Sequence, residues 1–373
     1  MEGLDLKRDI SLYIHIPFCK SKCSYCAFYS TVDHSLKDEF LDTLLKQITQ
    51  LNKVVKKPYK TIFIGGGNPG VLGFDNLLKI AELASSNGKC EEFTIEINPE
   101  YVTEEIEKLF KFVNRISVGI QSFSNRALKT IGRNACYEDN INALTILSTF
   151  KKKYNIHLNG DLITCIPGEG VDNTINDINT LSSFDVDHIS LYSLTFEEGT
   201  KLTQNCKPID EEAERQMLIS AWQCLENLGY KQYEVSNFAK KGYESIHNQV
   251  YWNLGQYIGL GPTAESSVGY EKVISLREKD SVEDYIKDPS FDAYRLSTEE
   301  LEEEYLLTHL RVKEGISKKD YQKRFSKNFD SVYKNFINNL DKELYIDNCD
   351  SFSLTKEGIL VENQVILTLA MAI

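Results

Sequence analysis

The sequence has few features that suit it to nucleic acids or to anionic membranes. Acidic side chains outnumber basic ones by 55 to 42, which gives a formal net charge of -13 over 373 residues. The basic run from Lys151 to Lys153 is most simply a solvated helix end. Because phosphate binding depends on clustered Lys and Arg, the composition argues against nucleic acid as a partner.

The sequence also lacks a recognisable secretory signal and a long apolar run. Asp5, Lys7, Arg8 and Asp9 interrupt any apolar stretch near the N-terminus. The run from Val365 to Ile373 is too short to cross a bilayer. We therefore expect a cytoplasmic protein, in which cysteines stay reduced and a tight cysteine cluster binds metal more readily than it forms disulfides.

Three of the nine cysteines stand close together. Cys19, Cys23 and Cys26 follow an apolar run typical of a β-strand, so we expect their thiolates on one compact loop. An iron-sulfur cube takes four ligands when it is closed, and a loop with three leaves one iron free for a small molecule. Two simpler interpretations remain. A structural zinc site would need His15 or His34 at unusual spacing, and buried thiols would need a less polar loop.

From Ile10 to about Thr195, short apolar runs alternate with longer segments of helical period, which is typical of repeated βα units with parallel strands. The predicted strands are Ser11 to Ile16, Thr61 to Ile64, Phe93 to Ile97, Arg115 to Ile120, His157 to Ile163 and His188 to Tyr192. The predicted helices are Leu36 to Leu51, Asp75 to Ser85, Thr103 to Phe110, Glu138 to Phe150 and Asp172 to Leu181. This α/β pattern fits a partial barrel or an open doubly wound sheet.

Polar and glycine residues stand near the carboxyl ends of the predicted strands, where parallel sheets bind ligands. The cysteine loop follows the first strand, and the glycine triplet Gly65 to Gly67 follows the second. Glu96, Gln121 and Asp161 fall in otherwise apolar strands, where an unpaired polar group would be costly to bury. Each feature alone could be a tight turn or a satisfied hydrogen bond, but together they predict one site assembled from many strands.

Beyond Thr195 the pattern changes to a predicted helix from Glu211 to Leu228 and a predicted strand from Lys231 to Phe238. The passage HNQVYWN follows, from His247 to Asn253. Its residues suit an aromatic anchor in a small core as well as they suit a ligand site. A neutral imidazole is also a common axial ligand of haem iron, and aromatic side chains can stack on a porphyrin.

A third region begins near Leu296, where Ser297 and Glu300 have the spacing of a helix capping box. Helices are predicted over Glu299 to Arg311, Lys318 to Phe325 and Asp330 to Lys342, followed by two wing strands over Leu344 to Ile346 and Ser353 to Thr355. We therefore expect a small winged-helix-like unit. The predicted domains are residues 1–200, 201–295 and 296–373.

With these residues in view, the chain resembles the radical S-adenosylmethionine (SAM) proteins of the coproporphyrinogen oxidase group, and among them the haem chaperones. The resemblance covers most of the chain. It is carried by YIHIPF before the cysteines, GGGNP from Gly65, EINPE from Glu96, GIQSF from Gly119, GRN from Gly132, DLITCIPGE from Asp161 and HISLYSLTFEEGT from His188. The passage HNQVYW matches a His-Asn-x-x-Tyr-Trp motif associated with haem binding in the chaperones.

The resemblance implies a partial (βα)6 barrel with a [4Fe-4S] cluster on Cys19, Cys23 and Cys26, and with SAM chelating the free iron. It implies that residues near the strand ends line the SAM sites: Tyr13, Tyr25, Gly66, Gly67, Asn68, Glu96, Gln121, Arg133 and Asp161. It also implies haem contacts from the motif: His247, as the haem-linked residue and candidate axial ligand, with Asn248, Tyr251 and Trp252.

Two functions are compatible with the resemblance. One is a haem chaperone that delivers haem to respiratory haemoproteins, with a homodimer and peripheral membrane association as further expectations. The other is oxygen-independent decarboxylation of coproporphyrinogen III, in which SAM would supply the radical. The oxidases have a fourth cysteine where this chain has Phe28, and a longer N-terminal extension, so both departures favour the chaperone. Asn68 stands where the glycine motif usually has Thr.

Overall fold

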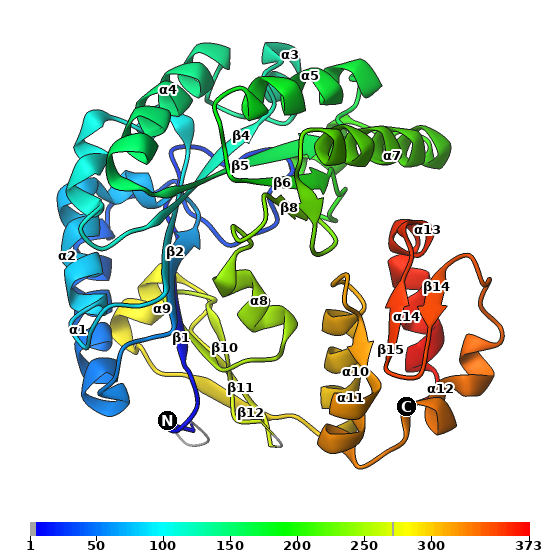
Figure 1. Ribbon diagram of the computed structural model, residues 1–373. Helices are drawn as coiled ribbons and strands as arrows, with labels where there is room; N and C mark the ends of the chain where they lie inside the picture. The colour runs from blue at the N-terminus through cyan, green and yellow to red at the C-terminus, as the bar shows by residue number, and fades with distance from the viewer. Residues whose placement is uncertain (1–4, 271) are drawn as a thin grey trace.

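The computed structural model describes residues 5–270 and 272–373 and builds most of them around one curved sheet (Figure 1). Its centre is formed by parallel neighbours in sequence order: β1 (Ser11–Ile16), β2 (Thr61–Gly66), β3 (Glu92–Ile97), β4 (Arg115–Gln121), β5 (His157–Thr164) and β6 (His188–Ser193). The predicted parallel α/β sheet is therefore confirmed, and the predicted strand ends are correct to within two residues.

Shorter strands extend both edges of this sheet. At the β1 edge lie β9 (Tyr257–Leu260), parallel to β1, and then the antiparallel strands β10 (Glu265–Val268), β11 (Ile274–Arg277) and β12 (Asp292–Arg295). At the β6 edge lie the antiparallel strands β8 (Asn237–Ala239) and β7 (Lys231–Gln232). Residues 201–295 thus complete the sheet begun by the first 200.

The single strand predicted from Lys231 to Phe238 is wrong, because the chain reverses direction between β7 and β8, which pair with each other antiparallel. There the Val235 N–H donates to the Arg311 carbonyl at 2.8 Å, and the Lys313 N–H donates to the Tyr233 carbonyl at 3.1 Å. The backbone groups that a continuous strand would use are thus bonded to a segment far along the chain.

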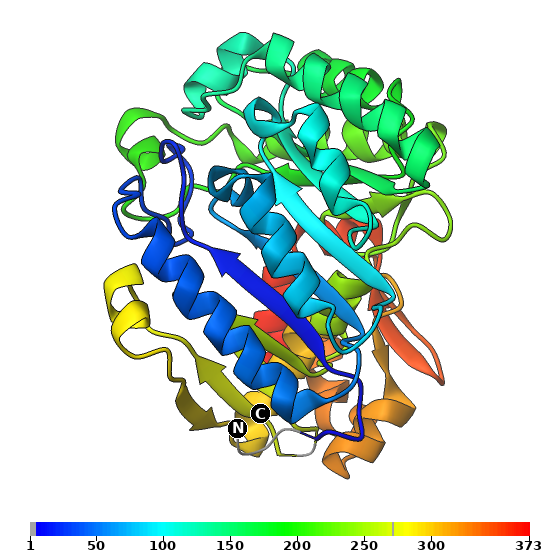
Figure 2. The ribbon, with the colours of Figure 1, turned by 90° about the vertical axis from the view of Figure 1, so that its left-hand side faces the viewer.

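Helices cover the outer face of the sheet, and Figure 2 shows α1 lying along β1. They are α1 (Lys37–Val55), α2 (Phe74–Ala84), α4 (Tyr137–Tyr154), α5 (Val171–Ser182), α7 (Glu211–Asn227) and α9 (Val282–Lys287). The short helices α3 (Asn125–Thr130) and α6 (Lys201–Asn205) instead contribute to a small separate hydrophobic cluster next to the cysteine loop. The helix predicted over Thr103 to Phe110 is instead the short 3-10 helix η3 (Glu104–Leu109). In the described part of the chain, no helix is both long and apolar enough to span a membrane.

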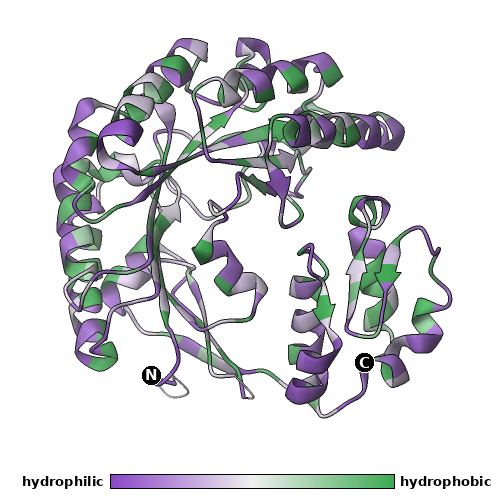
Figure 3. Cartoon of the chain, viewed as in Figure 1, coloured by the Kyte–Doolittle hydropathy of each residue, from purple (hydrophilic) through white to green (hydrophobic). Residues whose placement is uncertain are grey.

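Side chains alternate in character along the central strands. Outward-facing residues such as Ile62, Ile64 and Phe93 are buried in the same hydrophobic core as the inner faces of the helices, and the hydropathy colouring in Figure 3 shows apolar stripes along those helices. The alternate residues, such as Thr94 and Arg115, face the inside of the curve and are polar. The sheet therefore encloses a polar bore within an apolar shell.

The C-terminal part of the chain has its own hydrophobic core, which contains Leu306, Tyr321, Phe329 and Phe352. Its elements are α10 (Thr298–His309), β13 (Ile316–Ser317), α11 (Lys318–Phe325), α12 (Phe329–Ile337), β14 (Tyr345–Asp347), β15 (Ser351–Leu354), α13 (Lys356–Leu360) and α14 (Glu362–Ala370). The capping box at Ser297 is confirmed. The predicted helix to Lys342 ends earlier, at the asparagine pair after Ile337, a residue type that favours helix ends.

The predicted wing strands exist as the antiparallel pair β14 and β15, and β13 adds a third strand to them. The separate core supports our proposal that residues 296–373 form a unit of their own. That this unit is a winged helix stays a prediction, as does the boundary at residue 200.

Candidate cofactor site

The cysteine loop is fixed to the carboxyl end of the sheet by backbone hydrogen bonds. The Cys19 N–H donates to the Thr31 carbonyl at 2.9 Å, the Asn68 N–H to the Phe18 carbonyl at 2.8 Å, and the Ser24 N–H to the Ile131 carbonyl at 2.9 Å. These bonds tie the loop to the segments that follow β2 and β4. The loop conformation is therefore set by the barrel scaffold.

All three thiols of the loop are partly exposed. Burial raises the pKa of Cys19 to about 11, and the like charges of Cys26 and Cys23 oppose its ionisation further. Three neighbouring thiolates therefore need positive charge to balance them, as the irons of a cluster provide. Among the described residues, no group of three or more His, Cys, Asp or Glu side chains is placed to hold a single metal ion. A cube carries its thiolates on different irons, so they need not converge on one point.

The glycine triplet leaves space beside this loop. A Cβ atom on Gly67 would come within 2.7 Å of the Phe18 carbonyl oxygen and 3.0 Å of Cys19 Sγ. Gly66 has a φ of 105°, which side chains rarely tolerate, and its N–H donates to Glu96 Oε2 at 3.3 Å. The backbone of the triplet can therefore approach a ligand of the cluster closely.

Asn68, which departs from the usual Thr, caps the short helix η1 (Pro69–Leu72). Its Oδ1 accepts from the Gly70 N–H at 3.1 Å. Its Nδ2 is buried and has no hydrogen-bond partner among the described residues. The oxygen is thus committed to the fold, whereas the amide nitrogen remains a donor for a ligand or water.

Arg133 links the cysteine loop to the end of β4. Its Nη2 donates to the Gly119 carbonyl at 2.5 Å and to Asn98 Oδ1 at 3.1 Å, and its Nη1 lies 3.8 Å from Cys23 Sγ. Arg133 thus places a buried positive charge beside the cysteine loop. Gln121 ends the strand with a φ of 68°, at the point where the register with β5 shifts.

Two carboxylates, Glu96 and Asp161, lie in the bore. Burial and the charge of Asp161 raise the pKa of Glu96 to about 8. Burial also raises the pKa of Asp161, which accepts from Ser117 Oγ at 3.2 Å and from Asn159 Nδ2 at 2.7 Å. At neutral pH the bore thus holds at least one protonated carboxylic acid. A cation bound beside it would favour loss of that proton.

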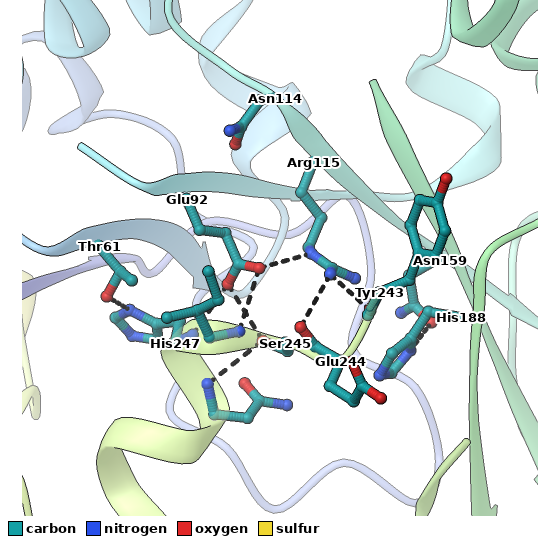
Figure 4. A network of polar contacts seen from close by, with 12 residues as sticks. Thr61, Glu92, Asn114, Arg115, Asn159, His188, Tyr243, Glu244, Ser245 and His247 are labelled. Carbon is teal, nitrogen blue, oxygen red and sulfur yellow. Dashed lines mark hydrogen bonds and ion pairs between the residues drawn. The ribbon is translucent and has the colours of Figure 1, made fainter. Parts of the chain in front are cut away.

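The HNQVYW motif forms helix α8 (Ile246–Trp252), which lies within the curve of the sheet (Figure 1). A buried ion pair holds its start, as Figure 4 shows. Arg115 Nε donates to Glu92 Oε2 at 2.9 Å, and both side chains are 3% exposed. Glu92 also accepts from the N–H groups of Ile246 and His247, at 3.1 and 2.9 Å. Since Glu92 and Arg115 begin β3 and β4, α8 docks at the amino end of the barrel.

His247 is fully buried in this helix and both of its ring nitrogens are engaged. Nδ1 lies 2.7 Å from Thr61 Oγ1, and Nε2 lies 2.8 Å from the Tyr251 hydroxyl. The ring stacks on Phe63 at a centroid distance of 4.9 Å, and burial lowers the pKa of His247 to about 3. The imidazole is therefore neutral, and iron coordination would require one of these hydrogen bonds to break. Axial ligation by His247 does not fit this arrangement as it stands.

One cavity of about 290 Å³ joins the two predicted sets of residues. Tyr13, Glu96 and Asp161, expected at SAM, line it together with residues expected at haem, namely His247, Asn248 and Tyr251. The remaining predicted residues lie outside its wall: Tyr25, Gly66, Gly67, Asn68, Gln121, Arg133 and Trp252. The structure thus brings the motif helix to the bore but leaves the cysteine loop at the opposite mouth.

Sequence reasoning missed the residues that dock α8. Glu92, Arg115, Thr61 and Phe63 sit in predicted strands or next to them, on the face that turns into the bore. Their signal is a polar residue at every second position, such as Glu92, Thr94 and Glu96, in strands otherwise taken as apolar. Such an alternation is typical of a strand with one polar face, and it is visible in the sequence alone.

The sequence and the fold both match known proteins. The profile described as the Radical SAM superfamily matches residues 13–181. A protein of Bacillus subtilis named heme chaperone HemW is 33% identical over 377 residues, which cover 95% of this chain and 97% of that protein. The chain belongs to the HemW family. The Escherichia coli HemW is 34% identical over 70% of this chain and 71% of its own length.

The fold of this HemW family member is also that of a solved structure. Coproporphyrinogen III oxidase HemN from Escherichia coli, described as a radical SAM enzyme, matches with a TM-score of 0.84 and covers 100% of this chain and 92% of its own. At 17% identity this likeness establishes the barrel alone. Membership of the radical SAM superfamily supplies a [4Fe-4S] cluster and SAM as the cofactors of this HemW family member.

Proposed function

We propose that this chain is a haem chaperone that binds haem together with a SAM-liganded [4Fe-4S] cluster. The observation that carries the proposal is helix α8, whose HNQVYW motif is docked into the radical SAM barrel and shares a cavity with Tyr13 and Glu96. Relatives matched over nearly the whole chain are named heme chaperones, which supports the same function.

In this proposal the cluster is held by Cys19, Cys23 and Cys26, and Arg133 and the glycine triplet lie beside it. Asn68 Nδ2 and Arg133 Nε are buried donors without partners in the described part of the chain. They suit a ligand with oxygen acceptors, such as the carboxylate of SAM. Glu96 and Asp161 suit its positive groups. The cluster, when bound, supplies the iron to which SAM attaches.

His247 acts here by holding α8 in place, through Thr61 on one side and Tyr251 on the other. It is a positioning residue for the haem-binding segment. Asn248, Tyr251 and Trp252 then present the polar and aromatic groups of the motif to haem. Trp252 Nε1 is buried without a partner among the described residues, so this donor is also available.

The oxidase remains the second candidate, because HemN shares the barrel. One feature of this chain argues against it. Phe28 stands where the oxidases have a fourth cysteine, and it is 73% exposed.

We further propose that the chaperone acts in the cytoplasm and passes haem to respiratory haemoproteins. Such acceptors are membrane-bound or membrane-associated, so the proposal includes peripheral contact with the membrane. It also includes a homodimer. Gel filtration coupled to light scattering, with and without reconstituted cluster, tests the dimer, and a mass of one chain under both conditions would contradict it.

The function itself is tested by titrating the anaerobically reconstituted protein with haem while the Soret band is followed. A saturable shift with one haem per chain is expected, and no formation of protoporphyrinogen is expected from coproporphyrinogen and SAM. Absence of a Soret shift would overturn the chaperone proposal. Turnover of coproporphyrinogen would establish the oxidase instead.

The cluster assignment has its own test. Cys23→Ala should abolish the charge-transfer absorption of the iron-sulfur centre while the circular dichroism of the fold stays the same. Cys349→Ala is the matched control, because Cys349 is an exposed thiol far along the sequence from the loop. Retained absorption in Cys23→Ala would contradict the assignment.

A further inference from the structure

The bore contains two buried donors that have no hydrogen-bond partner among the described residues. One is Nη1 of Arg115 and the other is the Thr94 hydroxyl. Arg115 is 2% exposed and Thr94 is 1% exposed, and both residues line the cavity. Leaving such groups unpaired is costly, so a pair of them on one wall indicates a ligand or ordered water with acceptor atoms.

The two donors are neighbours in the sheet. Thr94 on β3 and Arg115 on β4 are paired in register, and both side chains face the bore. The rest of the Arg115 guanidinium is fixed, because Nε donates to Glu92 and Nη2 donates to the Tyr243 carbonyl at 2.7 Å. These bonds hold the buried guanidinium in place and leave Nη1 as its donor without a partner among the described residues.

A third group comes from the motif helix. Asn248 lines the same cavity, and its side chain makes no hydrogen bond to the residues that the structure describes. A planar guanidinium N–H, a hydroxyl and an amide around one small space suit the oxygens of a carboxylate. The cavity has room for one such substituent but is small for a whole macrocycle.

The charges nearby permit an anion there. Glu92 balances Arg115 from the far side of the guanidinium, so recognition depends on directed donors more than on net charge. Glu96 and Asp161 lie higher in the same bore, and burial raises the pKa of both carboxyls, which lowers their repulsion of a second anion. Their hydrogen-bonded positions also keep them turned to other partners, Gly66 and Ser117.

We propose that Arg115, Thr94 and Asn248 form a carboxylate-binding subsite in the bore, and that its occupant is a propionate of haem. This inference rests on the proposed function. It gives the motif a polar contact to haem that needs no free nitrogen on His247. The same chemistry could be met by the carboxylate of SAM, so the experiment separates these two sources.

The test compares haem with haem dimethyl ester, in which both propionates are blocked, by Soret titration of the full chain. The wild type should bind haem about tenfold to hundredfold more tightly than the ester, as expected for hydrogen bonds to a charged group. Arg115→Lys keeps a positive charge beside Glu92 but loses the planar guanidinium, and with it the Nη1 donor. It should abolish the preference for haem over the ester. Thr94→Val removes a hydroxyl that no described protein group uses, so it should fold normally and reduce the preference severalfold.

Thr174→Val is the matched control, since it removes a buried hydroxyl that bonds to Thr164 at 2.8 Å, outside the cavity. It should keep the full preference. SAM binding, measured on the reconstituted protein, should be unchanged in Thr94→Val. A loss of SAM affinity with the haem preference intact would assign the subsite to SAM and overturn the inference.

Equal binding of haem and ester by the wild type would also overturn the inference, since water would then satisfy the donors, while the chaperone function would stand. Binding of neither ligand would overturn the chaperone function itself, and the subsite with it.

Discussion

The two ends of the barrel are built on different principles. At the carboxyl end, partly exposed thiols sit on a loop held by backbone hydrogen bonds, and donors such as Asn68 Nδ2 lack partners among the described residues. At the amino end, α8 is held by a buried ion pair and by a histidine with both nitrogens bonded. The open end is arranged to receive a cofactor. The closed end holds a protein segment in one position, and it leaves Arg115 Nη1 and the Thr94 hydroxyl as donors for the proposed subsite.

The largest effect is expected when the ion pair at the closed end is removed. Glu92→Ala leaves Arg115 buried without its partner and frees two N–H groups of α8. We expect a loss of about 3–5 kcal/mol in the free energy of unfolding, measured by urea denaturation. Asp75→Ala is the control, because it removes an exposed, solvent-screened ion pair with Lys108 and should leave the free energy of unfolding almost unchanged. Equal losses in the two variants would contradict the anchoring role.

At the closed end, His247 should make the stability of the protein depend on pH. Burial lowers its pKa from 6.5 to about 3, so the unfolded chain binds a proton that the folded protein does not. Stability should therefore fall as pH drops from 6.5 towards 3, by up to about 1.4 kcal/mol per pH unit. His247→Gln should cost about 2 kcal/mol at pH 7, from two altered hydrogen bonds, and flatten this decline. A decline as steep as in the wild type would place the titration elsewhere, for example at His309.

Glu96, in the middle of the bore, should show the opposite pH dependence. Its pKa is raised from 4.5 to about 8, so the folded protein holds a proton that the unfolded chain releases. The stability that this group contributes is complete below pH 4.5 and is lost as pH rises through 8. Glu96→Gln should remove about 1–2 kcal/mol of that loss between pH 6 and 8, seen in thermal melts. If stability fell with pH as steeply in Glu96→Gln as in the wild type, the loss would come from Glu234, whose pKa is raised to about 7.

The smallest effect is expected at Asn68, at the open end. Asn68→Thr keeps an oxygen that can cap η1 and removes the Nδ2 donor, which has no partner among the described residues. We expect the free energy of unfolding to change by less than about 1 kcal/mol. SAM affinity, measured by calorimetry on the reconstituted protein, should fall severalfold, because the Nδ2 donor proposed for the SAM carboxylate is lost. An unchanged affinity would show that Nδ2 does not contact SAM.

The open end could be predicted from the sequence because the patterns that indicate it lie within short stretches of the chain. Apolar β-branched runs gave the strands, the carboxyl ends of parallel strands gave the location, and Cys19, Cys23 and Cys26 gave the chemistry. The closed end could not, because its contacts join distant segments. Glu92 and Ser245 are 153 residues apart in the chain, and nothing in either neighbourhood indicates the other. The same holds for the turn between β7 and β8, where the Val235 N–H donates to the carbonyl of the distant Arg311.

The motif illustrates a subtler limit. The sequence predicted that His247 lies at a ligand site, and the structure places it beside the bore. Its imidazole, however, bonds to Thr61 and Tyr251, and no spacing rule could have shown that both nitrogens are used. The residues suited an aromatic anchor as well as a ligand site, and the resemblance implied a candidate iron ligand, whereas the packing shows His247 supporting the helix.

We propose that the two ends of the barrel act separately, with the cluster at the carboxyl end and haem at the amino end. The most direct test measures both ligands in two variants, with iron-sulfur absorption after reconstitution and Soret titration of the cluster-free chain. Cys23→Ala should lose the cluster and bind haem as the wild type does. His247→Ala should keep the cluster and bind haem at least tenfold more weakly. Loss of haem binding in Cys23→Ala, or unchanged haem binding in His247→Ala, would contradict the account.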